Sequence, residues 1–535
     1  MTWVDLAVLA DGEARAVGAV VHELVDSASS AAVRAGIGLA GGAVLARGLR
    51  AGRLHWSCSL AAVAFAWLAR AELGALALSL GIAGLSASHT GRRWQREDLD
   101  DGADLARRAA ARRAPLQTLI AAAARGIAKR RRTADGVVVL GIDRRGRDVV
   151  VPVGGGRHAL IVGATGSGKT VTQSVLAAAA VAQGSAAIVI DPKGDGHMYE
   201  TLRRAAAAAG RPFFAWTPSG GAAYNPYARG EASEIADKVL AGEHFTEPHY
   251  LRQAQRYIGQ AVAALRAAGE DVSLRGLARH LDPERLELLA RSIPGDASET
   301  HEYLDSLTSR QRTDLAGVRD RLAILAESDV GRWLDPAACA EPRLELLEAV
   351  ESGASVYFNL EADRRPLLSQ MLGAAIVQDL LAMTASLQGR PLPALVLIDE
   401  FSAVAARGVV RLFARARSAG LTLVLGTQEL SDLRTRGNEH IADQVLGNVA
   451  LLVAHRQFVP ASAELISQLA GVRGTWRVTR HSRGHTTRTR VQERVLAPEQ
   501  ITALGVGQAA VIAPSAGTPA ALVNIRAAGI GEVRR

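Results

Sequence analysis

The chain has little cysteine and few aromatic residues for its length. Cys58 and Cys339 are its two cysteines, and their separation argues against a disulfide framework or a thiolate metal site. Aromatic residues make up 4%, and the apolar content is mostly Ala, Leu and Val, which favours helices with a few buried strands. The N-terminus lacks a basic n-region and carries Asp5, Asp11 and Glu13, so we expect no cleavable signal sequence.

The length of 535 residues is too great for one hydrophobic core, so we expect two or three domains. The formal net charge is +9, and Arg supplies nearly all of the positive charge. Arg suits phosphate recognition, although an Arg bias can also follow from the base composition of a genome. The charge is therefore only weak support for a polyanionic partner.

Two apolar runs near the N-terminus, residues 54–69 and 73–88 with Arg70 and Glu72 between them, are candidates for a membrane hairpin. Each run is slightly shorter than the roughly 20 residues that a helix needs to cross a bilayer. The residues that flank the pair are Arg47, Arg50, Arg53, Arg92, Arg93 and Arg96. A hairpin over 54–88 would keep both basic flanks in the cytoplasm, in accordance with the positive-inside rule. A buried Ala-rich hairpin in a soluble domain explains the pattern equally well, and residues 35–46 are an alternative span.

From residue 135 onward, strand patterns alternate with helix patterns. The expected elements are a hairpin over 137–142 and 148–153, strands at 158–162 and 186–190, and a helix between these strands that ends at Gln183. Strand, helix and strand in this order predict a parallel sheet. Residues 91–134 before it carry charges of both signs and end in the run Lys129-Arg130-Arg131-Arg132. We expect a solvated helical connector there, although a basic cluster beside a membrane can also contact acidic lipid.

The alternation is interrupted between about Asn225 and Pro342, where the periodicity is helical and no convincing strand occurs. This pattern predicts an all-α insertion. Strands are expected again at 355–359, 394–398, 421–425, 449–454 and 509–512. Residues 476–495 alternate around Gly484, which predicts a hairpin.

The strongest signal is a loop that matches the pattern G-x-x-x-x-G-K-[ST]. It comprises Gly163, Ala164, Thr165, Gly166, Ser167, Gly168, Lys169 and Thr170. An apolar strand precedes it and a helix follows it, which is the context of a phosphate-binding loop and disfavours a turn without a ligand. Glycines let the backbone wrap phosphates, and the helix N-terminus binds negative charge. We expect Lys169 to reach the β- and γ-phosphates of ATP, and Thr170 to ligate Mg²⁺.

Two carboxylates follow the apolar strand at 394–398, at the edge where open α/β sheets bind ligands. Asp399 fits the role of holding Mg²⁺, and Glu400 fits the base that polarises the attacking water. A solvated strand end would explain this pattern alone, but together with the phosphate loop it predicts an ATPase site. Gln428 follows the strand at 421–425 and is expected to sense the γ-phosphate or position water, with a solvent-facing Gln as the alternative.

Three weaker signals involve basic residues. The helix before the Gln428 strand carries Arg411, Arg415 and Arg417, which predict either a solvated face or an arginine that completes a neighbouring subunit's site. At the strand end after residue 190, Asp191 could approach Mg²⁺ and Lys193 could sense phosphate or contact DNA, while a plain turn explains them equally well. The expected hairpin is rich in Arg and His and is a candidate contact to a nucleic-acid backbone, a subunit edge or a solvated surface. Its basic residues are Arg477, Arg480, His481, Arg483, His485, Arg488 and Arg490.

Taken in order, these motifs resemble the TraG/TraD family of type IV secretion coupling proteins. The residues that carry the resemblance are Arg157-His158 before the loop Gly163 to Thr170, Val189-Ile190-Asp191-Pro192-Lys193-Gly194-Asp195, Tyr224-Asn225-Pro226, Gly331-Arg332-Trp333-Leu334-Asp335-Pro336, Leu397-Ile398-Asp399-Glu400-Phe401-Ser402, Ala416-Arg417-Ser418-Ala419-Gly420 and Gly426-Thr427-Gln428-Glu429-Leu430-Ser431-Asp432-Leu433. The resemblance extends over about residues 135–525. It implies an α/β fold in which an all-α domain is inserted into a RecA-like P-loop motor, preceded by an N-terminal helical region with a membrane hairpin.

The resemblance also implies how the chain is divided and what it does. The expected parts are an N-terminal region at 1–90, a connector at 91–134, a nucleotide-binding domain at 135–224 and 346–525, an insertion at 225–345, and a tail at 526–535. The implied function is a hexameric ATPase that uses ATP and Mg²⁺ to recruit DNA, expected to be single-stranded, with its attached relaxase. Its implied partners are relaxosome proteins and secretion-channel subunits at the bacterial inner membrane, with the motor in the cytoplasm. Without an inserted hairpin, the whole chain would be cytoplasmic.

By its position before the Gln428 strand, Arg417 becomes the candidate arginine finger of this family. Two other functions stay open. One is a chromosome pump of the FtsK/HerA kind, against which the Asp191 to Asp195 motif and the helical insertion argue. The other is an ATP-regulated scaffold that docks effector proteins at a secretion pore and moves no DNA.

Overall fold

The computed structural model describes residues 31–51, 56–68, 75–100, 136–144, 146–243, 245, 247–293, 298–433, 440–480, 486–513 and 518–526. The described residues form two compact units: those up to residue 100 together with 474–491, and those from 136 to 473 and from 492 onward. Most of the expected connector, its basic run Lys129 to Arg132, and His481, Arg483 and His485 lie outside the described residues.

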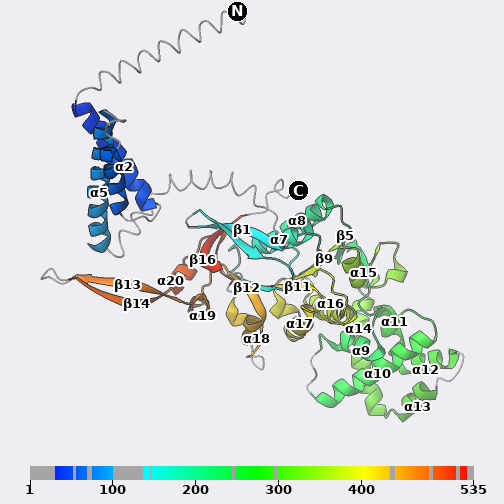
Figure 1. Ribbon diagram of the computed structural model, residues 1–535. Helices are drawn as coiled ribbons and strands as arrows, with labels where there is room; N and C mark the ends of the chain where they lie inside the picture. The colour runs from blue at the N-terminus through cyan, green and yellow to red at the C-terminus, as the bar shows by residue number, and fades with distance from the viewer. Residues whose placement is uncertain are drawn as a thin grey trace, which may run out of the picture. The chain divides into compact units, whose positions relative to one another are not determined.

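A twelve-stranded sheet forms the centre of the larger unit (Figure 1). Its order is β2-β1-β16-β15-β12-β3-β11-β10-β4-β9-β5-β6. The strands are β1 Val137–Asp143, β2 Asp148–Pro152, β3 His158–Val162, β4 Ala186–Asp191, β5 Phe213–Thr217, β6 Gly220–Gly221, β9 Ser355–Asn359, β10 Ala394–Ile398, β11 Leu421–Thr427, β12 Val449–Ala454, β15 Gln508–Ala513 and β16 Thr518–Ile525. The neighbouring strands from β12 to β5 in this order are parallel, and the outer pairs are antiparallel.

The parallel strands are buried on both faces, which is why their sequences are apolar without alternation. Every residue of β3, β4 and β10 is buried. Val189 and Leu397 face one hydrophobic cluster, which includes side chains of α7 (Lys169–Ala182) and α8 (Gly196–Ala208). Ile190 and Ile398 face the other cluster, which includes side chains of α16 (Pro366–Ser386) and α17 (Phe401–Ala416).

Parallel pairing gathers four loops at one edge of the sheet. Ile398 of β10 lies in register with Ile190 of β4 on one side and with Leu425 of β11 on the other. Thr427 of β11 lies in register with Val162 of β3. The loops that follow β3, β4, β10 and β11 therefore lie at the same carboxyl edge, where this class of sheet binds its ligands.

The described residues of the expected insertion are mainly helical. Its helices are α9 Ala232–Leu240, α10 Pro248–Ala267, α11 Leu274–His280, α12 Pro283–Ser292, α13 Ser298–Ser306 and α14 Ser309–Ala326. Two short parallel strands, β7 (Ala223–Tyr224) and β8 (Arg343–Leu344), pair where the chain enters and leaves this segment. The limits of 225–345 stay a prediction.

The remaining elements of the C-terminal half are short. They are α15 Leu346–Glu351, α18 Ile441–Asn448, α19 Pro460–Ala470 and α20 Pro498–Thr502, with a separate hairpin of β13 Val472–Arg480 and β14 Thr486–Arg494. The hairpin agrees with the expected alternation around Gly484. Strands β5 and β16 were not expected from the sequence.

The N-terminal helices differ in detail from the expected hairpin. They are α2 (Ala31–Ala51), α3 (Leu60–Leu68) and α5 (Ala75–Asp100). The run at 54–69 contains only the short helix α3, preceded by a 3-10 turn, and the run at 73–88 begins α5. Among the described residues, α16 is the one helix that is long and apolar enough to cross a membrane, and 72% of its apolar window is buried inside the protein.

Candidate nucleotide-binding site

The phosphate-binding loop connects β3 to α7, and its backbone requires glycine. Gly168 precedes α7 with a φ of 105°, a conformation that residues with a Cβ rarely adopt. A Cβ on Gly163 would lie 2.6 Å from Ser167 Oγ and 2.7 Å from His455 Cβ. Within the described part of the chain, no side chain caps the N-terminus of α7. The N–H groups at this helix end therefore suit the negative charge of phosphates.

The loop is held by backbone hydrogen bonds to two segments that are distant in sequence. Ala164 N–H donates to the carbonyl of Arg456, just beyond β12, at 3.1 Å. On its other side, Gly507 N–H, from the turn before β15, donates to the carbonyl of Ser167 at 2.9 Å. The C-terminal strands thus support the shape of the phosphate loop directly.

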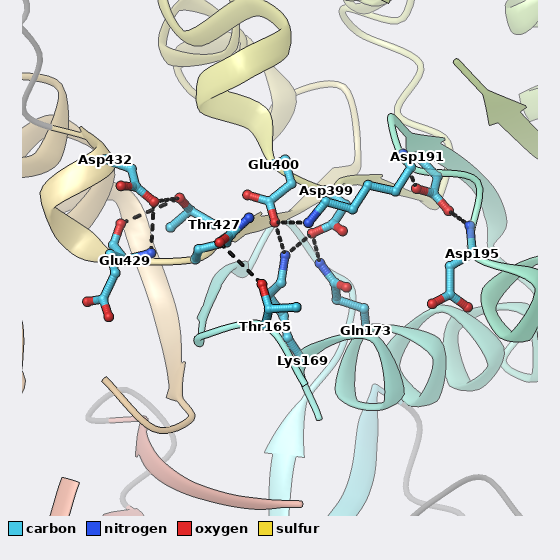
Figure 2. Close-up of polar contacts among 12 residues, drawn as sticks. Thr165, Lys169, Gln173, Asp191, Asp195, Asp399, Glu400, Thr427, Glu429 and Asp432 are labelled. Carbon is cyan, nitrogen blue, oxygen red and sulfur yellow. Dashed lines mark hydrogen bonds and ion pairs between the residues drawn. The ribbon is translucent and has the colours of Figure 1, made fainter. Parts of the chain in front are cut away.

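Lys169 lies against both carboxylates that follow β10 (Figure 2). Its Nζ is 2.5 Å from Asp399 Oδ1 and 2.9 Å from Glu400 Oε1. All three residues are buried. Burial lowers the pKa of Lys169, but the charges of Asp399 and Glu400 outweigh this effect, so its pKa is raised overall. The structure therefore brings together Lys169, Asp399 and Glu400, three of the four residues that we expect around one nucleotide, the fourth being Thr170; their catalytic roles stay predictions.

Asp399 has a second donor that the sequence analysis did not identify. Gln173 Nε2 donates to Asp399 Oδ1 at 2.8 Å, and Gln173 is fully buried. Gln173 follows Lys169 by four residues, so both side chains project from the same face of α7. This spacing is the signal that could have identified it.

Each of the two predicted Mg²⁺ ligands neighbours Lys169, Thr170 in the sequence and Asp399 through a side-chain contact. Thr170 is in the first turn of α7. Among the described residues, no group of three His, Cys, Asp or Glu side chains could hold a metal ion. A hydroxyl and a carboxylate suit Mg²⁺, which retains several waters and takes oxygen ligands from its substrate phosphates. The residues present therefore fit this ion.

Gln428 lies beside the phosphate loop. Its Oε1 accepts a hydrogen bond from Thr165 Oγ1 at 3.3 Å. Its carbonyl accepts one from Gln457 Nε2 at 3.1 Å, and Gln457 is fully buried. Sequence analysis did not identify Gln457, because its proximity depends on β12 and β11 flanking the same strand, β3. The position of Gln428 is compatible with its predicted role as a sensor.

Asp191 and Lys193 make different contacts in the structure. The carboxylate of Asp191 accepts hydrogen bonds from the backbone N–H groups of Lys193, Gly194 and Asp195, which is the geometry of a turn (Figure 2). This arrangement agrees with the turn that we weighed against an approach to Mg²⁺. Lys193 Nζ reaches Glu400 Oε1 at 3.0 Å.

Arg417 lies at the end of β3 opposite to the phosphate loop. It follows α17, and its Nε donates to the carbonyl of Gly156 at 3.4 Å, before β3 begins. Arg411 and Arg415 are exposed on the same helix. Among the described residues, Asp399 and Glu400 pair with Lys169 and Lys193 and with none of these three arginines. Any role for Arg417 in catalysis therefore requires a neighbouring subunit, and this role stays a prediction.

For most of the basic hairpin the structure describes the backbone alone. Arg490 is exposed, and the side chains that are not described include those of Trp476, Arg477, Arg480 and Arg488. At the base of the hairpin, Arg494 pairs with Glu464 at 2.5 Å. Nucleic-acid binding by this hairpin stays a prediction.

Two family models match separate parts of the chain. Residues 393–505 match the TraM recognition site of TraD and TraG, and residues 149–272 match the central domain of the helicase HerA. Comparison of the sequence with curated proteins gave no match.

Solved structures of one bacterial conjugative coupling protein are similar over most of the chain. Unbound TrwBdeltaN70 aligns with a TM-score of 0.55 and 18% identity, covering 77% of this chain and 93% of that one. TrwB in complex with ADP and Mg²⁺ aligns with a TM-score of 0.55 and 19% identity, covering 76% and 94%. At such identities the likeness shows the fold.

The fold and the loop after β3 define the class of RecA-like P-loop proteins with an inserted all-α domain, as the sequence predicted. Within this class, the chain is similar to the TraG/TraD family of type IV secretion coupling proteins. The family model over residues 393–505 confirms this resemblance.

Proposed function

We propose that the chain is an ATP-hydrolysing motor that recruits DNA and pumps it, with an attached relaxase, into a type IV secretion channel. The observation that carries this proposal is the contact of Lys169 Nζ with Asp399 and Glu400, at 2.5 and 2.9 Å, beside a glycine-rich loop. The likeness to TrwB, which was solved with ADP and Mg²⁺ and with an ATP analogue, supports a nucleotide at this loop.

The chemistry follows from the positions of the side chains. Residues 163–170 would hold the phosphates of ATP, and Thr170 and Asp399 would hold Mg²⁺, which neutralises phosphate charge. Glu400 accepts a proton from water as the water oxygen bonds to the γ-phosphorus. The bond from the γ-phosphorus to the bridging oxygen breaks, and ADP and phosphate leave. Gln428 would orient the water or sense the γ-phosphate.

The partners are proposed from the comparisons, from the position of Arg417 and from the family resemblance. The model over residues 393–505 is named for recognition of TraM, which supports a relaxosome protein as partner. Because Arg417 lies away from the phosphate loop of its own chain, a ring, expected to be a hexamer, would let it reach the next subunit's site. DNA and channel subunits are proposed from the family resemblance.

We also propose that the N-terminal helices anchor the protein in the bacterial inner membrane, with the motor in the cytoplasm. A Cβ on Gly38 of α2 would contact Ile82 of α5, and one on Gly42 would contact Ser86. The two helices therefore run in the same direction and pack closely through small residues, as membrane helices do. Their carboxyl-terminal ends both carry arginines, which the positive-inside rule places in the cytoplasm.

Apolar side chains on this N-terminal unit face outward. Ile37, Phe65, Trp67 and Leu85 are all more than half exposed. Such a surface suits lipid. Fractionation of cells that produce the full chain tests the anchor: the protein should stay with membranes after washes with high salt and alkaline carbonate. Release by either wash would contradict insertion.

The ATPase proposal is tested by turnover of detergent-extracted full-length protein, with and without single-stranded or duplex DNA. We expect DNA to stimulate hydrolysis. Lys169→Ala should abolish turnover, and Glu400→Gln should bind ATP but hydrolyse it slowly, by a factor of roughly 100 or more. Wild-type turnover in either variant would overturn the site. The exposed Arg390→Ala is the matched control and should retain wild-type rates.

One alternative has an observation in its favour. The match of residues 149–272 to the HerA central domain leaves room for a chromosome pump of the FtsK/HerA kind. Such a pump would be stimulated by duplex DNA and would not bind a relaxosome protein. Stimulation by a protein partner, with no response to DNA, would instead indicate a docking scaffold for secreted effectors.

A further inference from the structure

The ammonium group of Lys193 lies beside the predicted catalytic base. Its Nζ is 3.0 Å from Glu400 Oε1, and the same oxygen is 2.9 Å from Lys169 Nζ. The Glu400 side chain is 10% exposed, whereas that of Lys193 is 42% exposed. Two cations therefore meet at one carboxylate oxygen, and Oε2 is the oxygen that neither contacts.

The loop that carries Lys193 has a fixed shape. Asp191 is buried, and its Oδ1 accepts from the N–H groups of Lys193 and Gly194 at 2.9 and 3.0 Å. Its Oδ2 accepts from Asp195 N–H and from the Tyr357 hydroxyl, both at 2.6 Å. Burial raises the pKa of Tyr357, so this hydroxyl remains a donor at neutral pH. Every oxygen of Asp191 thus serves to shape the turn.

The loop after the neighbouring strand β9 encloses this turn. Gly194 has a φ of 76°, and a Cβ there would lie 2.5 Å from Asn359 Oδ1. The carbonyl of Asp191 accepts from Leu360 N–H at 3.0 Å. A turn held by this many hydrogen bonds places the Lys193 Cα reproducibly relative to Glu400, which an ordinary surface loop would not do.

Glu400 needs such support, because its own backbone does not favour its conformation. It is one of two described residues other than glycine with a positive φ, at 43°. It stands at the N-terminus of α17, and its side chain makes no capping hydrogen bond to that helix. In the proposed reaction Lys169 binds the phosphates, so that Lys193 remains, among the described residues, as the cation that contacts Glu400.

We propose that Lys193 is a positioning residue for hydrolysis. It holds Oε1 of Glu400 so that Oε2 meets the attacking water after Lys169 has turned to the phosphates. This inference rests on the proposed function. An oriented, ionised base reaches water in the geometry that proton transfer requires, and loss of that orientation slows the step without weakening ATP binding.

Kinetics of Lys193→Met in the full-length protein test the proposal. We expect kcat to fall roughly 10- to 100-fold, while KM for ATP and binding of a non-hydrolysable ATP analogue change less than about twofold. Lys193→Arg should recover part of the rate, because it retains a cation. Arg203→Met, which removes a cation from the exposed face of α8, is the matched control and should leave kcat unchanged.

A double-variant comparison separates action through Glu400 from a general structural effect. If Lys193 acts through Glu400, Lys193→Met should have no further effect on kcat in the Glu400→Gln background. If the two substitutions instead lower kcat by factors that multiply in the double variant, the proposal is overturned. A wild-type kcat in Lys193→Met, with Glu400→Gln inactive, would also overturn it. Wild-type turnover in Glu400→Gln alone would instead refute the proposed function itself.

Discussion

The imidazole of His455 contacts Thr172, on the first turns of the helix that follows the phosphate loop. His455 Nε2 lies 2.9 Å from Thr172 Oγ1, and Nδ1 lies 3.0 Å from the carbonyl of Gln508. A carbonyl only accepts, so Nδ1 carries the proton and Nε2 accepts from the threonine hydroxyl. The neutral ring thereby connects β12, β15 and α7 around the phosphate loop.

This contact predicts that the protein becomes less stable to unfolding as the pH falls. Burial lowers the pKa of His455 from 6.5 to about 4, and burial together with the charge of Arg417 lowers the pKa of His158 to about 4. In the unfolded chain each of these histidines binds a proton below a pH of about 6.5, whereas in the native protein it stays unprotonated down to a pH of about 4. The free energy of unfolding therefore falls as the pH falls from about 6.5 to 4. Each histidine contributes a loss of about 2 kcal/mol between pH 7 and 5.

Urea unfolding at pH 7 and pH 5 measures this loss. His455→Gln should lose about 2 kcal/mol less than the wild type over this interval, because the replaced side chain does not titrate. His197, which is exposed on α8, offers the control, and His197→Gln should follow the wild type. An unchanged pH dependence in His455→Gln would contradict the prediction.

Arg417→Ala should inactivate the assembled ring while leaving ATP binding intact. The reason is that Arg417 contacts Gly156, at the far end of β3 from its own phosphate loop. An arginine that completes a neighbour's site contributes roughly 10³- to 10⁵-fold to the rate. Mixing Arg417→Ala with Lys169→Ala subunits should restore part of the activity, because some interfaces then combine an intact loop with an intact arginine. Inactive mixed rings would count against action across the interface.

Lys238→Met should destabilise the attachment of the helical insertion to the sheet domain. Lys238 of α9 is 2% exposed, and its Nζ lies 2.6 Å from Asp379 Oδ1 on α16. The Tyr224 hydroxyl donates to the other oxygen of Asp379 at 2.8 Å. Removal of the cation leaves a mostly buried carboxylate without its partner charge, which costs about 3 kcal/mol.

The exposed pair of Arg291 and Glu287 on α12 is the comparison for this measurement. The side chains of Arg291 and Glu287 are 64% and 36% exposed, so solvent screens the pair, and Arg291→Met should cost less than about 1 kcal/mol. Urea unfolding of both variants at pH 7 gives the two values. Equal costs would show that burial does not set the strength of the Lys238 pair.

The elements that the sequence predicted well are those whose own residues are unambiguous. Strands β3, β9, β10 and β12 are short apolar runs bounded by polar residues, and their limits agree with the expectation. Strand β16 was missed, because its residues form a strand by pairing with β15 and β1 rather than by any local alternation. At the N-terminus the bounds of α3 and α5 differ from the two expected runs, since composition does not show where an Ala-rich helix begins or ends.

The candidate site also contains residues whose proximity the sequence predicts and contacts that it does not predict. The loop after β3 and the carboxylates after β10 belong to patterns that specify their chemistry, so their proximity could be predicted. The contacts of Lys193 with Glu400 and of His455 with Thr172 could not, because they depend on which strands are neighbours. β4 lies beside β10, and β12 beside β3, and no local pattern shows this order.

Gly426→Ala should damage the site with little effect on the fold. A Cβ at Gly426 in β11 would lie 2.2 Å from Gln173 Nε2 and 2.3 Å from Asp399 Oδ1, so it would displace the ends of both side chains. Since Asp399 Oδ1 contacts Lys169 and Asp399 is proposed to hold Mg²⁺, we expect the ATPase rate to fall roughly 100-fold and the Mg²⁺ requirement to rise. Gly447→Ala is the control: nothing lies within 4 Å of that Cβ, and α18 should gain about 0.5 to 1 kcal/mol. Mg²⁺ titration of the ATPase rate and urea unfolding of both variants separate the two effects, and full activity in Gly426→Ala would mean that Asp399 and Gln173 need not keep their observed positions.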